Sequence, residues 1–169
     1  MLPRFNRKGT RADKYCYVKL DIDELWPRLS IVKNPSKKGI HLGPLPSRSM
    51  ARLVVDALHT AVPLRRCTER LGRNFVAPTD APVCSAAQLG VAHCPCSGTA
   101  DAAEYARDVE VARRAMTGDP VISVGRLHDT MRSLATQQRF EEAATVRDRL
   151  PALLGAVKRH RLVETLRSA

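Results

Sequence analysis

Four of the five cysteines lie in the middle of the chain, and their thiols could bind a metal ion or pair as disulfides. They are Cys67, Cys84, Cys94 and Cys96, with 16, 9 and 1 residues between them. Zinc fingers usually begin with two cysteines about two to four residues apart, and no pair here has that spacing. His93 could replace a thiolate at a zinc site, although a histidine beside cysteines is more often incidental. The spacing alone does not distinguish a metal site from cysteines that bind nothing.

The cellular compartment bears on this choice. The N-terminal residues are basic but contain no apolar segment typical of a secretory signal. No run of about 18 apolar residues occurs, so we expect no membrane span. We therefore expect a cytoplasmic protein, in which disulfides are rare and clustered cysteines more often bind metal. Cys16 lies in a predicted strand and is expected to be a small buried hydrophobic residue.

The net charge of +11 is concentrated in the first part of the chain. Residues 1–73 contain 16 Lys and Arg against 6 Asp and Glu, whereas residues 74–169 contain 12 against 11. A basic surface attracts nucleic acid, because neutralising phosphates releases counterions. The alternative is a basic surface that only contacts water. The acidic cluster of Asp21, Asp23 and Glu24 is interpreted as a solvated turn.

The hydrophobic pattern predicts an α+β fold. Alternation and β-branched residues predict strands at 15–21, 27–34 and 40–46. Helical spacing then predicts a helix over 47–62, with Ser47 or Ser49 as its N-cap. Prolines, glycines and the four cysteines fill residues 64–99, where only short regular structure is expected.

The remaining residues are predicted to be helical. The first of these helices covers 101–119 and ends at Gly118. Asp119 and Pro120 fit the N-cap and first position of the next helix. A further helix starts within 139–150, and Pro151 should kink or break it near Leu150. The predicted parts are therefore 1–63, 64–99 and 100–169.

Several motifs, in this order, resemble the UvrC family of DNA-repair endonucleases. They are LPRFN, YVKLD, WPRLSIV, GIHLGPLPS, VVDALHTAVPLRRC, the cysteine segment and MRSLATQQRFEEAATVRDRL. The chain also resembles the UvrC-like half of proteins that carry a DnaQ-type exonuclease. The resemblance implies that residues 1–63 are the end of a GIY-YIG nuclease domain. Within the basic first part of the chain, we assign the DNA-binding residues to Arg4, Asn6, Arg7, Lys8, Arg48 and Arg52.

In that family the catalytic tyrosines, arginine and metal-binding glutamate precede the motif that is Pro3-Arg4-Phe5-Asn6 here. We therefore expect no catalytic residue within this chain and no nuclease activity from it alone. Two further alternatives remain: an active nuclease whose catalytic half is another chain, and a truncated product without function.

The family's four cysteines are associated with an iron–sulfur cluster, which needs four convergent thiolates. Here Ala92 stands where the family has its third cysteine, and the third cysteine of this chain's cluster is Cys94, two residues later. The resemblance implies an iron–sulfur cluster on Cys67, Cys84, Cys94 and Cys96, with zinc or no metal as alternatives.

Residues from about 120 to 150 resemble the UVR motif, a helical hairpin that pairs with a like hairpin in UvrB. The resemblance implies a partner-binding surface formed by Phe140, Glu141, Ala144, Arg147 and Asp148. The alternative is a hairpin that packs only on its own chain. The predicted function is a UvrC-like component of nucleotide-excision repair, and the alternative is a non-catalytic interaction module held together by a metal.

Overall fold

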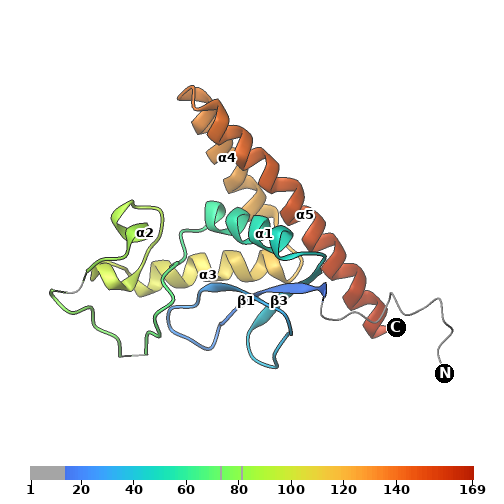
Figure 1. The fold of residues 1–169 in the computed structure, drawn as a ribbon, viewed down its shortest axis with the longest axis horizontal. Coiled ribbons are helices and arrows are strands. Elements are labelled where there is room, and N and C mark those ends of the chain that lie inside the picture. Colours follow the sequence, from blue (N-terminus) through green and yellow to red (C-terminus); the bar gives the residue numbers. More distant parts are fainter. Residues whose placement is uncertain (1–13, 73, 81) are drawn as a thin grey trace.

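The computed structural model describes residues 14–72, 74–80 and 82–169 of the chain. Within them the fold is α+β, as predicted, and consists of one small sheet and a set of helices (Figure 1). The strands are β1 (Cys16–Leu20), β2 (Leu29–Val32) and β3 (Ile40–Leu45). The helices are α1 (Arg48–Ala61), α2 (Ser85–Gln88), α3 (Ala102–Met116), α4 (Val121–Thr136) and α5 (Phe140–Ser168), with a 3₁₀ turn, η3, at Pro95–Ser97.

The sheet is antiparallel, and β1 lies between β2 and β3. Val18 at its centre pairs with Ile31 on one side and with Leu42 on the other. Alternate residues of β1 are buried, because successive side chains point to opposite faces of a strand. Cys16 is one of them, which confirms that it is a small buried residue.

Helix α1 packs between this sheet and the last two helices. Its N-cap is Ser47, whose Oγ accepts a hydrogen bond from the Met50 amide over 3.1 Å. This contact decides between the two serines predicted as caps. The buried face of the helix consists of Ala51, Val54, Ala57, Leu58 and Ala61. Leu53 is 39% exposed and lies outside this buried face.

The predicted break at Pro151 does not occur. Helix α5 runs without interruption from Phe140 to Ser168 (Figure 1). Pro151 is exposed, whereas the neighbouring Leu150 and Leu153 are buried against the rest of the fold. Burial of this apolar face on both sides of the proline outweighs the missing backbone hydrogen bond and the clash, which cost about 3 kcal/mol.

Helices α4 and α5 form a hairpin whose tip extends away from the sheet (Figure 1). Gly118 has φ +118° directly after the C-cap of α3, which confirms where that helix was predicted to end. Pro120 is the N-cap residue of α4, so this helix begins one residue later than predicted. None of the helices in the described part of the chain is long and apolar enough to span a membrane.

Candidate metal centre

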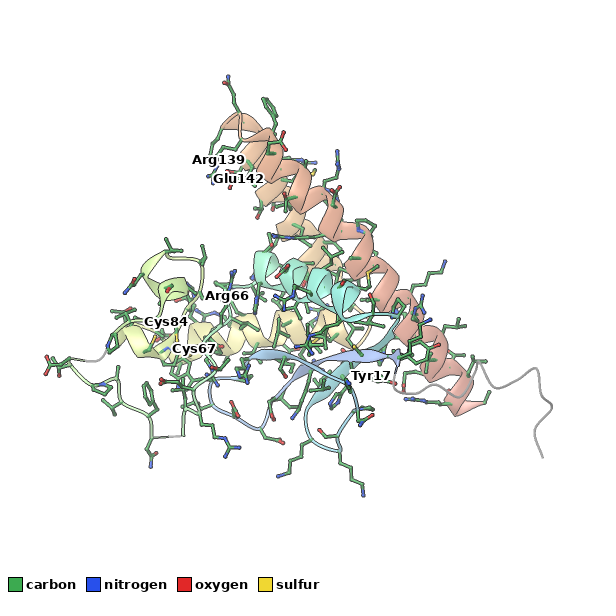
Figure 2. The ribbon with its side chains drawn as sticks, viewed as in Figure 1. Tyr17, Arg66, Cys67, Cys84, Arg139 and Glu142 are labelled. Atoms are coloured by element: carbon green, nitrogen blue, oxygen red, sulfur yellow. The ribbon has the colours of Figure 1, made fainter. Side chains whose placement is uncertain are left out.

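Three loops bring the clustered cysteines near the N-terminal part of α3, where Figure 2 labels Cys67 and Cys84. Cys67 lies in the loop after α1, Cys84 is the N-cap residue of α2, and Cys94 and Cys96 flank Pro95 in η3. Pro95 is suited to the first position of this turn, because its φ is fixed near the helical value. The turn brings the Cys94 and Cys96 sulfur atoms to the same side.

The Sγ atoms of Cys84, Cys94 and Cys96 lie within 4.8 Å of one another. The Cys67 Sγ lies 3.2 Å from that of Cys94. A tetrahedral ion with metal–sulfur bonds of about 2.3 Å separates its sulfur ligands by about 3.8 Å. All five cysteines are free, and Cys94 is only 1% exposed. Cys84, Cys94 and Cys96 therefore form an all-thiol group compact enough for a metal ion, whereas Cys67 lies outside this group, next to Cys94.

A buried arginine holds the loop that carries Cys67. The Arg65 side chain is 1% exposed, and its Nη1 donates to the carbonyl oxygens of Cys67 (3.2 Å) and Glu69 (2.8 Å). The same Nη1 lies 3.5 Å from the Cys67 Sγ. Its Nη2 pairs with Glu24 over 3.1 Å. Charged donors of this kind make strong hydrogen bonds and fix the backbone of the loop.

Tyr105 on α3 supports the same loop from the other side. Its hydroxyl accepts a hydrogen bond from the Arg65 amide over 3.0 Å and donates one to the Pro27 carbonyl over 2.5 Å. Its ring packs edge-on against Trp26, with 5.0 Å between centroids. Sequence reasoning missed both Arg65 and Tyr105. The only local signal was an arginine two residues before a cysteine, which does not reveal burial.

The surroundings of Cys94 and Cys96 shift the pKa values of these two thiols in opposite directions. Burial raises the pKa of the Cys94 thiol, and hydrogen bonding with Cys96 adds to this effect. Burial has the same effect on Cys96, but hydrogen bonds from the Cys84 backbone and from neighbouring thiols lower its pKa below the ordinary value. Thiolates bind metal and protons compete with the metal, so of these two thiols Cys96, with its lowered pKa, ionises more readily than Cys94.

Other candidate ligands lie elsewhere. The Nδ1 of His93 faces Asp108 at 3.8 Å, and His93 does not belong to the group of metal-binding side chains found in the described residues. Asp21 pairs with Lys19 over 2.8 Å, and Glu24 pairs with Arg65. The acidic cluster predicted as a solvated turn is therefore partly neutralised by its own neighbours.

The predicted DNA-binding residues are only partly described. Arg4, Asn6, Arg7 and Lys8 lie outside the described residues. Arg48 and Arg52 are exposed one turn apart on α1. A cavity between α1 and α5 is lined by Met50, Leu53 and Arg159, so the Arg159 side chain lies beside α1. This third cation was not predicted, because only the tertiary fold brings α5 next to α1.

Four of the five predicted partner-binding residues line one hollow near the tip of the hairpin. These residues are Phe140, Glu141, Ala144 and Arg147, together with Met131 of α4. The Phe140 side chain is 64% exposed at the start of α5. Asp148 lies apart from them and lines the cavity between α1 and α5 instead, although its Oδ1 accepts from Arg147.

Residues 15–115, from β1 to α3, match the family model described as the UvrC/Cho excinuclease middle domain. This match covers more than half of the chain and includes all four clustered cysteines. The chain belongs to the UvrC family. The match crosses the predicted boundaries at residues 63 and 99, and that division of the UvrC-family chain stays a prediction.

Individual relatives agree with this assignment. The UvrABC system protein C of Natronomonas pharaonis is 35% identical over 151 residues, which is 89% of this chain and 25% of the relative. That of Syntrophotalea carbinolica is 32% identical over 164 residues, 96% of this chain and 26% of the relative. A Mycobacterium tuberculosis protein named as a bifunctional exonuclease/endonuclease is 32% identical over 155 residues, 92% of this chain and 23% of the relative.

The UvrC-family chain thus spans about a quarter of the length of the curated relatives it matches. No solved structure is similar enough to count as a match. The family model ends at residue 115, before α4 and α5, so it does not test the predicted UVR motif.

Proposed function

We propose that this chain acts in nucleotide-excision DNA repair, where it binds DNA through its basic surface and a repair partner through the α4–α5 hairpin. The observation that carries the proposal is the match of residues 15–115 to the UvrC/Cho excinuclease middle domain. The exposed Arg48 and Arg52 on α1 support DNA binding, because guanidinium groups contact phosphates regardless of sequence. Arg159 of α5 lines a cavity with Met50 and Leu53 and adds a cation beside the same helix.

The DNA-binding part is tested with a duplex oligonucleotide at several salt concentrations. Replacing both Arg48 and Arg52 by Gln should weaken binding and lower the slope of log affinity against log salt by about one for each phosphate that is no longer neutralised. Arg107→Gln with Arg132→Gln is the matched control, since these exposed arginines lie on α3 and α4 and the change in charge is equal. Equal weakening in both double variants would contradict a specific role for α1.

The four clustered cysteines are proposed to hold a metal centre that joins the three loops. The donor set fits, because Cys84, Cys94 and Cys96 form a compact group of free thiols. Cys94 is almost fully buried, and Cys67 lies next to it as a fourth thiol. The family resemblance favours an iron–sulfur cluster, and zinc is the alternative. When bound, either group would cross-link the segment between α1 and α3, whose regular structure is otherwise short.

This centre is tested by anaerobic purification followed by absorption spectroscopy and elemental analysis. A brown protein that contains iron supports the cluster, and a colourless protein that contains zinc supports the single ion. A protein that contains neither iron nor zinc would overturn the proposal. Cys94→Ala should abolish metal binding. Cys16→Ala, which removes a buried thiol from the sheet and not from the cluster, should retain the metal.

The partner proposed for the hairpin is a second UVR-like hairpin such as that of UvrB. The hollow lined by Phe140, Ala144 and Met131 supports this, because an exposed aromatic side chain beside small residues suits the close approach of another helix. We also propose that the chain alone does not cleave DNA. Incubation with lesion-containing duplex and Mg²⁺ or Mn²⁺ tests this, and any incision by the pure chain would contradict it.

A further inference from the structure

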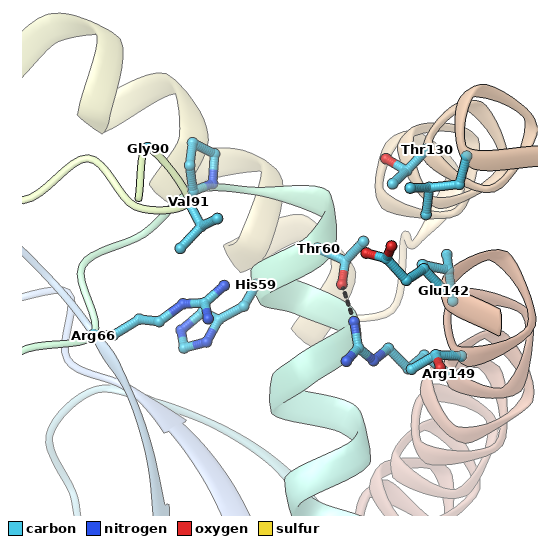
Figure 3. A pocket seen from close by; sticks show the side chains of 12 residues that line it. His59, Thr60, Arg66, Gly90, Val91, Thr130, Glu142 and Arg149 are labelled. Carbon is cyan, nitrogen blue, oxygen red and sulfur yellow. Dashed lines mark hydrogen bonds between the residues drawn. The ribbon is translucent and has the colours of Figure 1, made fainter. Parts of the chain in front are cut away.

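A second cavity lies between α1, α4, α5 and the loop at Gly90 and Val91 (Figure 3). Its volume of about 500 Å³ is within the range of small-molecule sites, roughly 300–1,000 Å³. Among the described residues, none of the clustered cysteines lines it, and neither do Arg48, Arg52 or the residues predicted to bind a partner hairpin. The cavity is therefore separate from the proposed metal centre and from both proposed binding surfaces.

Two arginines approach this cavity from different elements. Arg66 follows α1 and is exposed, and within the described residues its guanidinium has no hydrogen bond or ion pair. Arg149 on α5 donates through Nη1 to the Thr60 hydroxyl over 2.8 Å (Figure 3). That hydroxyl in turn donates to the Asp56 carbonyl over 2.7 Å, which holds the arginine in place. Guanidinium groups present forked donors that match phosphate oxygens.

A histidine on α1 adds an unused polar atom. The Nε2 of His59 is buried and has no hydrogen-bond partner in the part of the chain that the structure describes. His59 lines the same cavity, beside Arg66 (Figure 3). Burial and the positive charge of Arg66 lower the pKa of His59 to about 4, so the ring is neutral at physiological pH. A neutral imidazole can carry its proton on Nε2 and donate it to an oxyanion. Buried polar atoms without partners are uncommon and call for an explanation.

One carboxylate also lines the cavity, and it is already paired. Glu142 accepts two hydrogen bonds from the Arg139 guanidinium, over 2.6 and 2.5 Å. This bidentate pair neutralises the Glu142 charge at the rim. Arg66 and Arg149 then leave the cavity with a net positive charge, which favours an anion.

We propose that this cavity binds a tetrahedral phosphate group, held by the guanidinium groups of Arg66 and Arg149 and by the imidazole of His59. Both arginines line the cavity, and the unpartnered His59 lies beside Arg66, which together suit an anion with several acceptor oxygens. The phosphate belongs either to the backbone of bound DNA or to a free phosphate compound. The site goes beyond the proposed repair function, because it is lined neither by the clustered cysteines nor by Arg48 and Arg52.

Calorimetric titration of the full chain with inorganic phosphate, in chloride buffers of matched ionic strength, tests the proposal. Saturable binding is expected, and Arg66→Gln should weaken it about tenfold, since this variant removes a hydrogen bond to a charged group. Arg66 is exposed and unpaired within the described residues, so this variant should fold normally. Arg149→Gln should weaken binding similarly. Arg132→Gln on the exposed surface of α4 removes the same charge away from the cavity and should change nothing.

A second arm identifies the source of the phosphate. If Arg66→Gln and Arg149→Gln also reduce duplex affinity and its salt slope, the natural ligand is a DNA phosphate. If they abolish phosphate binding and keep duplex affinity, it is a free phosphate compound. Absence of saturable phosphate binding, or equal weakening by Arg132→Gln, would overturn the proposal while leaving the proposed repair function untouched.

Discussion

The Nε–H of Arg65 donates to the carbonyl oxygen of Trp26 over 2.7 Å and so joins the loop before β2 to the loop that carries Cys67. Arg65 is a buried charged residue in a core that is otherwise almost entirely apolar. Such a charge is tolerated only when it is paired and its donors are satisfied, and Arg65 meets both conditions through Glu24 and three carbonyl oxygens.

Replacing Arg65 should therefore destabilise the whole domain. Arg65→Gln leaves the Trp26 and Glu69 carbonyls without their donor, and we expect a decrease of about 3 kcal/mol or more in the free energy of unfolding. Urea unfolding followed by circular dichroism measures it. The neighbouring Arg66→Gln is the control and should change stability by less than about 0.5 kcal/mol, because Arg66 is exposed. Similar values for the two variants would show that the buried contacts contribute little.

Phe140→Ala should separate partner binding from folding. The side chain is 64% exposed, so we expect a decrease in stability below about 0.5 kcal/mol and at least a tenfold weaker affinity for a UVR-like hairpin. Leu153→Ala, which truncates a fully buried residue of the same helix, should cost about 2–5 kcal/mol. Thermal melts and a pull-down with a UvrB-type hairpin provide both measurements. A large decrease in stability in Phe140→Ala would instead support a hairpin that packs only on its own chain.

Acid should destabilise the fold through His59. Its pKa is lowered from 6.5 to about 4 by burial and by Arg66, so between these pH values the unfolded chain binds a proton that the folded chain does not. Stability therefore falls as pH drops from about 6.5 to about 4, by about 3 kcal/mol in total. Burial also lowers the pKa of His41, helped by Lys19, and this acts in the same direction.

Comparison with His59→Gln isolates the contribution of His59. Both proteins carry His41 and the same cysteines, so release of metal at low pH cancels in the difference. The free energy of unfolding of the variant, measured in buffers without phosphate, should depend less on pH than that of the natural chain. Parallel pH profiles would show that His59 is not the group responsible.

Pro151→Ala should stabilise the protein. The substitution restores an amide that can donate to the Arg147 carbonyl and removes a ring clash, which together are worth up to about 3 kcal/mol. Gly155→Ala is a useful control, because a Cβ there meets no atom within 4 Å and changes helix propensity alone. Gly155→Ala should raise the free energy of unfolding by about 1 kcal/mol. If Pro151→Ala raises the free energy of unfolding by no more than Gly155→Ala does, the proline does not destabilise α5 beyond its effect on helix propensity.

The sequence by itself determined the strands, most helix boundaries, the α+β class and the family. These features follow from local signals: alternation along β1, the cap at Ser47 and the glycine after α3 all act within a few residues. The family resemblance also rests on short motifs in order, and the match over residues 15–115 confirms it.

Only the tertiary structure decided how distant residues meet. The Cys67 sulfur reaches Cys94 because the loop after α1 is held by buried contacts to Trp26 and Tyr105, which no periodicity reveals. Helix α5 passes through Pro151 because its buried face packs against α1 and α4 on both sides of the proline. Local propensity acts along the chain, whereas burial and hydrogen bonding act through space, and in this protein the second set of forces positions the candidate sites.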